Sequence, residues 1–316
     1  MFDTLDDRHA LITQLNKVIP GVNFKDVKQL SSNRNVVYLT ETDQGHLVFK
    51  FAPADRCASL HHEYQAVSEL YMQGANVPRP VQLDGDLDLK VRLHGSIHSG
   101  RGYAFVAGTT LLPSEATFYE LGRSIGQLHN AWKTEEKPAW MPEATVAAFI
   151  HQPLEAISEV FNDRDQLRLA ESLASSVASV LEAYQDRALV GFTHGDAHHF
   201  NVIQTDDGKM IWMDMEDSSW QWRVYDLATA IWGTFGRGGT APVWDRLIAG
   251  YTSVRLLSDE EATLIRFLIF ARHLWWLGLH AANWNRWPQR YTSEQFFESG
   301  IGLLKAIGKD VCGLNN

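Results

Sequence analysis

Three side chains in the middle of the chain have the types and the spacing that phosphoryl transfer requires. Asp196 ends a His-Gly-Asp triplet, Asn201 follows five residues later, and Asp214 comes thirteen residues after Asn201. Phosphoryl transfer needs a carboxylate that takes the proton of the attacking hydroxyl, and hard oxygen ligands that hold magnesium on the phosphates. The pattern therefore predicts Asp196 as the base of an ATP-dependent phosphotransferase, with Asn201 and Asp214 as the ligands of Mg²⁺.

The sequence around these residues predicts the elements that position them. The apolar residues 188–190 predict a short strand or helix end before the loop that carries the triplet. Asp-Asp-Gly-Lys at 206–209 is a turn signal, and it is followed by an apolar return strand that ends at Asp214. This hairpin would bring Asn201 and Asp214 to one ion. His194 is expected to support the loop by hydrogen bonding and is the second candidate catalytic residue.

A strand and a helix upstream carry a lysine and a glutamate in the order expected of a nucleotide-binding lobe. Residues 36–40 and 47–51 predict two strands joined by a turn, and Lys50 lies on the second. Apolar residues at helical spacing predict a helix over 58–73, with Glu63 in its first turn. In such a lobe the lysine contacts the α- and β-phosphates of ATP, and the glutamate fixes the lysine. Lys50 and Glu63 are therefore candidate cofactor-binding residues.

The segment before the first of these strands is the candidate phosphate-covering turn. It reads Leu-Ser-Ser-Asn-Arg-Asn at 30–35 and contains no glycine. Without glycine the backbone cannot approach phosphate as closely as a glycine-rich loop does. The Ser32 hydroxyl and the Asn33 amide would have to make these contacts instead, so both residues are included in the predicted ATP site.

The order of elements predicts an α+β fold with two lobes of unequal size. Residues 1–107 predict a leading helix and a small antiparallel sheet, which would form the nucleotide-binding lobe. Residues 108–316 are mostly helical and would form the catalytic and substrate-binding lobe. Helices are predicted over 117–132 and 162–187, after a capping box at Ser258–Glu261, and after Ser293.

Size and charge limit the classes of partner. The chain has 316 residues, 45% of them hydrophobic, which is long enough for two lobes. Its net charge of −10 argues against nucleic acid and anionic membranes as main partners, since both require clustered Lys and Arg. The most apolar stretch, residues 264–282, contains two Arg and two His, which predicts a buried helix rather than a bilayer span. Two distant cysteines and a start without a secretory leader favour a cytoplasmic location, and nothing indicates the oligomeric state.

These motifs resemble those of the aminoglycoside phosphotransferase and choline kinase superfamily, which includes homoserine-kinase-like and stress-response-kinase-like enzymes. The likeness spans residues 24–285 and rests on HGDAHHFN at 194–201, DMED at 214–217 and YDLA at 225–228, with weaker support from residues 32–38, Lys50 and Glu63. The resemblance implies a protein-kinase-like fold, ATP, Mg²⁺ and an acceptor with a hydroxyl group. It also implies that Asp226 is a buried hydrogen-bond acceptor that braces the catalytic loop.

The chain departs from this family's pattern at two places. Family members usually have glycine just before the catalytic-loop Asn, where this chain has Phe200, so the loop backbone is expected to differ there. Glu216 and Asp217 place two more carboxylates close to the predicted ion. Glu216 is a candidate auxiliary ligand of the metal or the substrate, with a solvated acid as the alternative.

Tryptophan is concentrated in the second lobe, and this bears on the acceptor. Nine of the eleven tryptophans lie between residues 212 and 287. Most are expected to fill the core, since large aromatic side chains are usually buried. A minority beside carboxylates would bind an ammonium group by cation–π attraction, and the candidates are Trp220 and Trp222 with Glu216 or Asp217. The predicted acceptor is a small molecule, namely an amino alcohol, an amino acid or an aminoglycoside.

Three alternatives to a small-molecule kinase remain open. A Ser/Thr protein kinase of the stress-response type would share the chemistry, but only eleven residues separate Asp214 from Asp226, which leaves little room for a peptide-docking loop. A metal-dependent hydrolase would use His194, Asp196 and His198, which alternate along the chain and would suit zinc. A pseudokinase would keep the fold without turnover, and the glycine-free turn is its only support.

Overall fold

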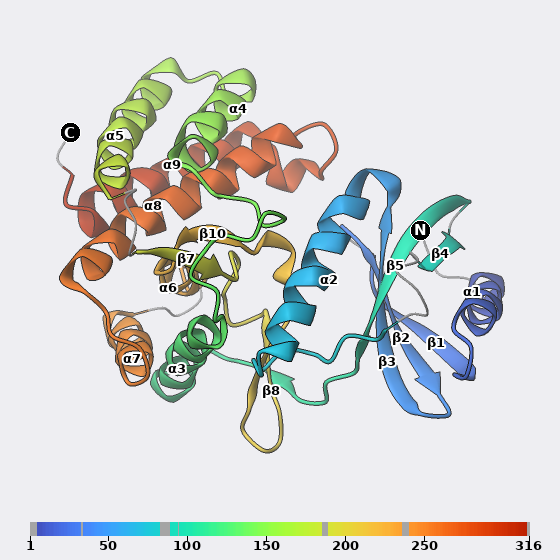
Figure 1. Cartoon of the computed structure of the whole chain (residues 1–316). Coiled ribbons are helices and arrows are strands. Elements are labelled where there is room, and N and C mark those ends of the chain that lie inside the picture. The colour runs from blue at the N-terminus through green and yellow to red at the C-terminus, as the bar shows by residue number, and fades with distance from the viewer. Residues whose placement is uncertain are drawn as a thin grey trace. The chain divides into compact units, whose positions relative to one another are not determined.

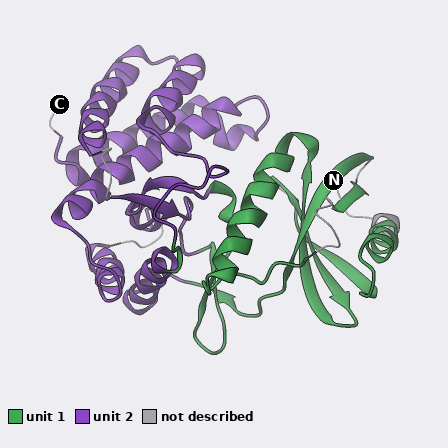
Figure 2. Cartoon of the chain, viewed as in Figure 1, with its two compact units in different colours: residues 1–111, 131–133, 200–217 green, residues 112–130, 134–199, 218–316 purple. Residues whose placement is uncertain are grey.

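The computed structural model describes residues 5–32, 34–82, 89–93, 95–184, 189–235 and 240–314. The chain divides into two compact units (Figure 2). Unit 1 comprises residues 1–111, 131–133 and 200–217, and unit 2 comprises residues 112–130, 134–199 and 218–316. Each unit is therefore built from separate stretches of the chain. The domain boundary near residue 107 stays a prediction.

A five-stranded antiparallel sheet is the centre of unit 1 (Figure 1). In spatial order its strands are β1 (Phe24–Ser31), β2 (Val36–Thr42), β3 (Gly45–Pro53), β5 (Ser96–Ala104) and β4 (Leu89–Leu93). β2 and β3 form a hairpin in which Val37 pairs with Lys50. Gly45 in its turn has a φ of 110°, which a residue with a side chain adopts only with strain. The two predicted strands around Lys50 are confirmed.

The alternation along β3 directs Lys50 away from the apolar core of unit 1. Phe49 and Phe51 are fully buried in a cluster with residues of α1 (Leu5–Val18). Since neighbouring residues of a strand point to opposite faces, Lys50 projects from the other face of the sheet. The helix α2 (Cys57–Met72) follows β3 through a short 3₁₀ turn and places its buried side against β3 and β5.

A second sheet of unit 1 has three strands in the order β6-β8-β9. β8 (Val202–Gln204) and β9 (Met210–Trp212) form the predicted hairpin, and β6 (Thr109–Thr110) pairs with β8. Asn201 immediately precedes β8, and Asp214 follows β9 by two residues. Because the strands run antiparallel, both predicted metal ligands lie at the same end of the hairpin.

Unit 2 is mainly helical, and its longest helix, α8 (Asp259–Ala282), packs against α4, α5, α6 and α9 (Figure 1). The other helices are α3 (Glu115–Ala131), α4 (Gln152–Val160), α5 (Arg164–Ala183), α6 (Tyr225–Trp232), α7 (Ala241–Thr252) and α9 (Glu294–Ala306). β7 (Val190–Thr193) and β10 (Ser219–Trp222) form a two-stranded antiparallel sheet. Of the two alternatives predicted before the His-Gly-Asp triplet, a short strand or a helix end, the structure has the strand. β10 was not predicted.

The predicted buried helix at 264–282 is confirmed as part of α8. Its capping box is present, because the Glu261 N–H donates to the Ser258 hydroxyl at 3.1 Å and the Ser258 N–H donates to the Glu261 carboxylate at 3.0 Å. By length and composition alone α8 could cross a membrane, but 67% of its most apolar window is buried inside the protein. Such burial is typical of a helix in a packed core.

Two glycines allow α3 and α7 to approach each other closely. A Cβ atom at Gly122 would lie within 3.0 Å of the Leu247 carbonyl group, and one at Gly250 would lie within 3.0 Å of the Tyr119 carbonyl group. These neighbours are backbone atoms, which cannot move aside as a flexible side chain can. We expect Gly122→Ala to force the helices apart and to lower the free energy of unfolding by about 3 kcal/mol, measured by urea denaturation.

Gly302→Ala is the matched control for this prediction. Gly302 is exposed on α9, and nothing lies within 4 Å of the position that its Cβ would take. Alanine there should raise the free energy of unfolding by about 0.5–1 kcal/mol, because it reduces the entropy of the unfolded chain. Similar effects of the two substitutions would contradict the close contact between α3 and α7.

Candidate active site

In unit 1, Lys50 is the centre of a cluster of charged side chains. Its Nζ donates to the carboxylates of Glu63 at 2.7 Å, Asp214 at 2.6 Å and Glu216 at 3.4 Å. The Lys50 side chain is only 12% exposed, so water screens these ion pairs weakly. The structure therefore brings together the predicted phosphate-binding lysine, its predicted glutamate partner and one predicted metal ligand.

Burial and charge act in opposite directions on the pKa values of this cluster. Burial alone would lower the pKa of Lys50, but the carboxylates of Glu63 and its neighbours raise this pKa well above its usual value. Lys50 is therefore charged at neutral pH. Burial raises the pKa of Glu63 to about 7, because the charge of Lys50 only partly offsets the loss of hydration.

Glu216 links three segments of unit 1. Its Oε1 accepts hydrogen bonds from Ser59 at 2.6 Å and from Arg56, and its Oε2 accepts one from Asn35 at 3.1 Å. Burial would raise the pKa of Glu216, but the charge of Lys50 and the Ser59 hydroxyl lower it to about 2. Glu216 is therefore ionised and held by protein donors from the start of α2 and from the turn before β2. Its auxiliary metal or substrate role stays a prediction.

The phosphate-covering turn is described only in part. Ser32 is exposed just after β1, and Asn33 lies outside the described residues. Asn35, at the end of the same turn, is buried and contacts Glu216. The contacts of Ser32 and Asn33 with phosphate stay predictions.

The backbone at Asp214 is strained. Its φ of 59° lies in the left-handed region, and within the described residues Asp214 is the single non-glycine residue with a positive φ. The Met213 N–H donates to the Asn201 carbonyl at 2.8 Å, which continues the pairing of the hairpin beyond β8 and β9. Strained conformations concentrate at functional sites, where the surrounding structure holds them in place.

The carboxylates around Lys50 suit a hard divalent cation. Glu63, Asp214 and Glu216 each offer an oxygen atom, and these atoms lie within 4.8 Å of one another. Oxygen ligands of this type are those that Mg²⁺ and Ca²⁺ prefer. The Asp214 side chain is 49% exposed, against 5% for Glu63 and 9% for Glu216, so it is the carboxylate most accessible to an ion from solvent.

In unit 2, Asp226 holds the backbone of the loop that contains Asp196. Its carboxylate accepts from the His194 N–H at 2.8 Å and from the Gly195 N–H at 2.9 Å, and Nε2 of His129 lies 3.0 Å away. The side chains of Asp226 and His129 are fully buried. Removing a buried carboxylate would leave these donors without partners, at a cost of about 1–3 kcal/mol for each. Asp226 thus has the contacts of the bracing residue that the family resemblance implies.

Three side chains hold Asp196 in place. Its N–H donates to Nδ1 of His194 at 3.2 Å. Its carboxylate pairs with the Arg272 guanidinium and lies 3.4 Å from Nε2 of His198. Burial would raise the pKa of Asp196, but the charge of Arg272 and the contact with His198 hold it well below its usual range. Asp196 is therefore ionised, and 20% of its side chain is exposed. The catalytic roles of Asp196 and His194 stay predictions.

Arg272 is a site residue that sequence analysis did not identify. It lies on α8, and its guanidinium is 5.0 Å from the ring centre of Trp232 and 4.7 Å from that of Trp275. A sequence signal was available, because Arg272 is one of two arginines within a mostly apolar helical run. A charge in such a position requires a compensating buried partner, and here Asp196 is that partner.

His273 fixes the orientation of Trp232. The Trp232 indole N–H donates to Nδ1 of His273 at 3.1 Å, and Nε2 of His273 lies 2.8 Å from the Gly300 carbonyl oxygen. These partners require the neutral ring with its proton on Nε2. Burial lowers the pKa of His273 to about 4, although the Gly300 carbonyl acts in the opposite direction.

We expect acid to destabilise the protein through His273. Because its folded-state pKa lies below the ordinary value of 6.5, its contribution to stability is complete above pH 6.5 and is lost as the pH falls towards 4. Between pH 7 and pH 4.5, a His273→Gln variant should therefore lose about 2–3 kcal/mol less stability than the parent protein in urea denaturation. His151→Gln, which changes an exposed histidine, is the control. The same pH dependence in all three proteins would contradict this expectation.

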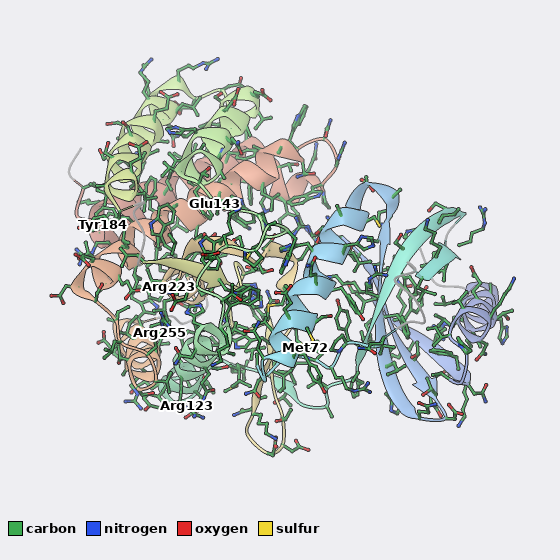
Figure 3. All side chains as sticks on the ribbon, in the orientation of Figure 1. Met72, Arg123, Glu143, Tyr184, Arg223 and Arg255 are labelled. Atoms are coloured by element: carbon green, nitrogen blue, oxygen red, sulfur yellow. The ribbon has the colours of Figure 1, made fainter. Side chains whose placement is uncertain are left out.

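The tryptophans predicted for the acceptor pocket are strand residues of unit 2. Trp220 and Trp222 are buried in β10. The Trp222 indole N–H donates at 3.0 Å to the carbonyl of Tyr184, a residue labelled in Figure 3. Asp217 is half-buried in the short 3₁₀ helix Met215–Asp217 of unit 1. The acceptor-binding role of these three residues stays a prediction.

His194, Asp196 and His198 do not form a zinc site in the part of the chain that the structure describes. Nδ1 of His194 faces the Asp196 N–H rather than a shared centre with His198. Over the described ranges, the carboxylates around Lys50 are the one group of three or more His, Cys, Asp or Glu residues with donor atoms within 4.8 Å. The geometry thus lends no support to a zinc hydrolase.

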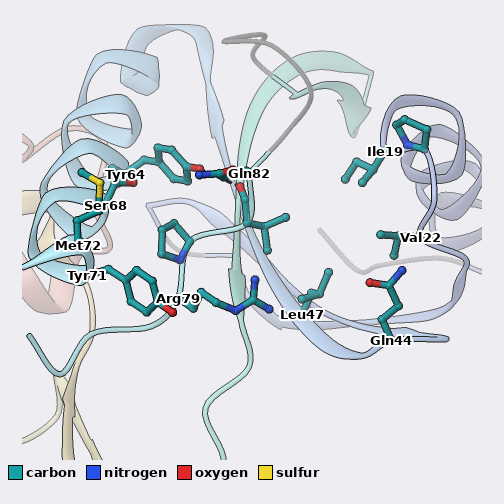
Figure 4. A pocket seen from close by; sticks show the side chains of 13 residues that line it. Ile19, Val22, Gln44, Leu47, Tyr64, Ser68, Tyr71, Met72, Arg79 and Gln82 are labelled. Carbon is teal, nitrogen blue, oxygen red and sulfur yellow. Dashed lines mark hydrogen bonds between the residues drawn. The ribbon is translucent and has the colours of Figure 1, made fainter. Parts of the chain in front are cut away.

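A separate cavity of about 480 Å³ lies in unit 1 near the carboxyl end of α2 (Figure 4). Its lining includes Leu47 of β3, Tyr64 and Tyr71 of α2, and Arg79 of the connector after α2. None of the predicted nucleotide, metal or catalytic residues lines it. The cavity is therefore distinct from the candidate active site.

Comparison with protein families finds a match over most of the chain. Residues 26–264 match the model of the phosphotransferase enzyme family, abbreviated APH. An amicoumacin kinase of Bacillus subtilis is 24% identical over 226 residues, which cover 67% of this chain and 64% of the kinase. Uncharacterised proteins of Deinococcus radiodurans and Synechocystis are 25% and 21% identical, and the matches span only 57% and 55% of their lengths.

Two solved structures share the fold. A microcompartment-associated aminopropanol kinase has a TM-score of 0.73 at 18% identity, with 96% of this chain and 98% of the kinase covered. The amicoumacin kinase hAmiN in complex with AMP-PNP, Ca²⁺ and Ami has a TM-score of 0.70 at 18% identity, with 90% and 88% covered. The predicted protein-kinase-like α+β fold class is confirmed.

Proposed function

Since the chain belongs to the phosphotransferase enzyme family, we propose that it transfers the γ-phosphoryl group of ATP to a hydroxyl group of a small molecule. The observation that carries this proposal is the Lys50 cluster, in which one buried lysine contacts Glu63 of α2 and Asp214 at the end of the β8–β9 hairpin. The relatives support the acceptor class, because the names amicoumacin kinase and aminopropanol kinase both denote small-molecule substrates.

Unit 1 supplies the groups for the nucleotide. Lys50 contacts the α- and β-phosphates of ATP, and Glu63 keeps the lysine extended from β3. Asn201 and Asp214 are the residues that would hold Mg²⁺, and the carboxylate oxygens around Lys50, one of which belongs to Asp214, fit such an ion. When bound, Mg²⁺ neutralises charge on the phosphate oxygens as the phosphoryl group is transferred.

Unit 2 supplies the group for the acceptor. Asp196 orients the acceptor hydroxyl and takes its proton while the acceptor oxygen bonds to the γ-phosphorus and the bond to the oxygen of ADP breaks. The low pKa of Asp196 is compatible with this role, because a loose transition state depends more on positioning than on strong basicity. Asp226 and His194 hold the loop so that the Asp196 carboxylate keeps its orientation.

Ligand-dependent melting tests the nucleotide part of the proposal. AMP-PNP with Mg²⁺ should raise the melting temperature of the protein, because a ligand at about 100 times its Kd stabilises the folded state by about 2.7 kcal/mol. The acceptor part is tested by ATP consumption with a panel of amino alcohols, hydroxy acids, polyols and aminoglycosides. Unchanged melting with AMP-PNP and Mg²⁺, together with no turnover across the panel, would overturn the proposal.

A further inference from the structure

The surroundings of Asp196 contain a site of the kind that binds an organic cation. The faces of Trp232 and Trp275 lie 5.0 Å and 4.7 Å from a common positive charge, and the carboxylate of Asp196 pairs with the same charge. Aromatic faces attract a cation through their quadrupole, and a carboxylate adds a full opposite charge. An ammonium-bearing acceptor would find in these three side chains the contacts that it needs.

In this protein the cation is the chain's own Arg272. Its side chain is 5% exposed, and its Nη1 lies 3.4 Å from the Gly195 carbonyl oxygen and 3.4 Å from the Tyr225 hydroxyl. Asp196 and Arg272 together carry no net charge. A second cation would therefore meet the positive guanidinium at short range and would have to share one carboxylate with it.

Of the two aromatic rings, Trp232 is held in place independently of Arg272. The indole N–H of Trp232 donates to His273, and His273 in turn contacts the Gly300 carbonyl of α9. Trp276 stacks on the His273 ring with centroids 5.8 Å apart. A side chain fixed by its own hydrogen bond and by packing keeps its position when the group beside it changes.

We infer that Arg272 is a specificity-determining residue, which fills the cation position beside Asp196 and selects acceptors that are neutral or anionic next to the reacting hydroxyl. Amino alcohols are thereby disfavoured, because like charges brought together without a counter-charge oppose binding. The inference rests on the proposed function, since it assigns the acceptor class of the same site. It also places the aromatic contacts at Trp232 and Trp275 rather than at the strand tryptophans.

Three acceptors that share a three-carbon skeleton test the selection. In 3-hydroxypropanoate, 1,3-propanediol and 3-amino-1-propanol the hydroxyl is the same and the other end is anionic, neutral or cationic. The wild-type protein should give a kcat/KM for the amino alcohol at least about tenfold below that for the diol. Arg272→Gln should raise the amino alcohol to diol ratio by about tenfold or more, whereas Arg272→Lys, which keeps the charge, should leave the ratio near the wild-type value.

The matched control is Arg246→Gln. Arg246 lies over the Tyr119 ring at 4.6 Å, as Arg272 lies over its tryptophans, but it is exposed. This variant should leave the acceptor ratio unchanged. A wild-type preference for the amino alcohol, or the same ratio in Arg272→Gln and wild type, would overturn the inference.

A binding experiment separates this inference from the proposed function, since it needs no turnover. In Arg272→Ala the space between the tryptophans is open, and millimolar methylguanidinium should raise the melting temperature and quench tryptophan fluorescence. The wild-type protein should respond in neither way. If ATP is not consumed with any acceptor but methylguanidinium binds to Arg272→Ala alone, the proposed function is wrong and the cation site stands. If Arg272→Ala and wild type respond alike, the cation site is wrong.

Discussion

Asp196→Asn is expected to lower kcat by about 10²–10⁴-fold, because asparagine keeps the shape of the side chain but cannot accept the proton of the acceptor hydroxyl. The rise in melting temperature with AMP-PNP and Mg²⁺ should persist, since Lys50 and Asp214 are unchanged. Steady-state kinetics and ligand-dependent melting on the same preparations separate the two effects. A change in kcat below tenfold would remove Asp196 as the base.

Asp196→Asn is also expected to lower the free energy of unfolding, and this effect must be measured separately from the effect on kcat. An amide in place of the Asp196 carboxylate would leave the Arg272 guanidinium without a counter-charge, which costs about 1–3 kcal/mol when hydrogen bonds to the amide remain. Asp165→Asn is the matched control, because Asp165 pairs with Arg168 on the exposed surface of α5. That control should leave both kcat and the melting temperature close to those of the parent protein.

Sequence analysis was most successful for local structure that depends on short-range patterns of residues. The turn signal at 206–209 and the apolar run after it predicted the β8–β9 hairpin, and the structure confirms it. The Ser258–Glu261 capping box correctly marked the start of α8, because the two reciprocal hydrogen bonds are encoded within four residues. The family resemblance is confirmed by the match over residues 26–264.

Contacts between distant parts of the chain could not be predicted in the same way. Arg272 and Asp196 are 76 residues apart in sequence, and their pairing depends on how α8 packs beside the loop after β7. Arg56 and Ser59 contact Glu216 from the start of α2 across even longer separations in sequence. Local periodicity specifies which face of an element is buried but not which partner it meets.

The tryptophans illustrate the same limit. Sequence analysis chose Trp220 and Trp222 because they follow two acidic residues closely in the chain. In the structure Trp222 is a core residue of β10 with a satisfied indole N–H, whereas Trp232 and Trp275 lie over a cation beside Asp196. Sequence analysis could not connect Trp232 and Trp275 with Asp196, because the cation between them is contributed by α8.

The Lys50→Met variant is expected to have lower activity and a lower free energy of unfolding than the wild type. Added Mg²⁺ should restore part of the lost stability but none of the activity. Without the lysine, kcat/KM for ATP should fall by about 10²–10³-fold, the size of effect seen when one preorganised donor to a developing charge is removed. The carboxylates of Glu63, Asp214 and Glu216 would repel one another at the distances that the ammonium now bridges. In EDTA the free energy of unfolding should therefore fall by about 3 kcal/mol, less than for a fully buried pair because Asp214 is half exposed.

The measurement belongs between about pH 8 and pH 9, because the pKa of Glu63 is raised to about 7 and its carboxylate is ionised only above that value. The pKa of Lys50 is raised in the folded state, so its contribution is complete below the ordinary lysine value of 10.5 and is lost only as the pH rises beyond it. Lys209→Met is the matched control, because Lys209 is an exposed lysine of unit 1 that pairs with Asp207 at 2.6 Å. It should change neither the melting temperature nor the kinetics appreciably.

Melting with Mg²⁺ tests whether the carboxylates around Lys50 form one cation site or whether Lys50→Met merely loses an ion pair. In Lys50→Met the three carboxylates would lose their shared ammonium group while their oxygen atoms lie within 4.8 Å of one another. Millimolar Mg²⁺ should therefore raise the melting temperature of this variant more than that of the wild type. Activity should not recover, because the metal would occupy the position from which we propose that Lys50 contacts phosphate. If Mg²⁺ raises the melting temperatures of Lys50→Met and Lys209→Met equally, the three carboxylates do not act as one site. The assignment of Lys50 as the cation that holds them together would then be wrong.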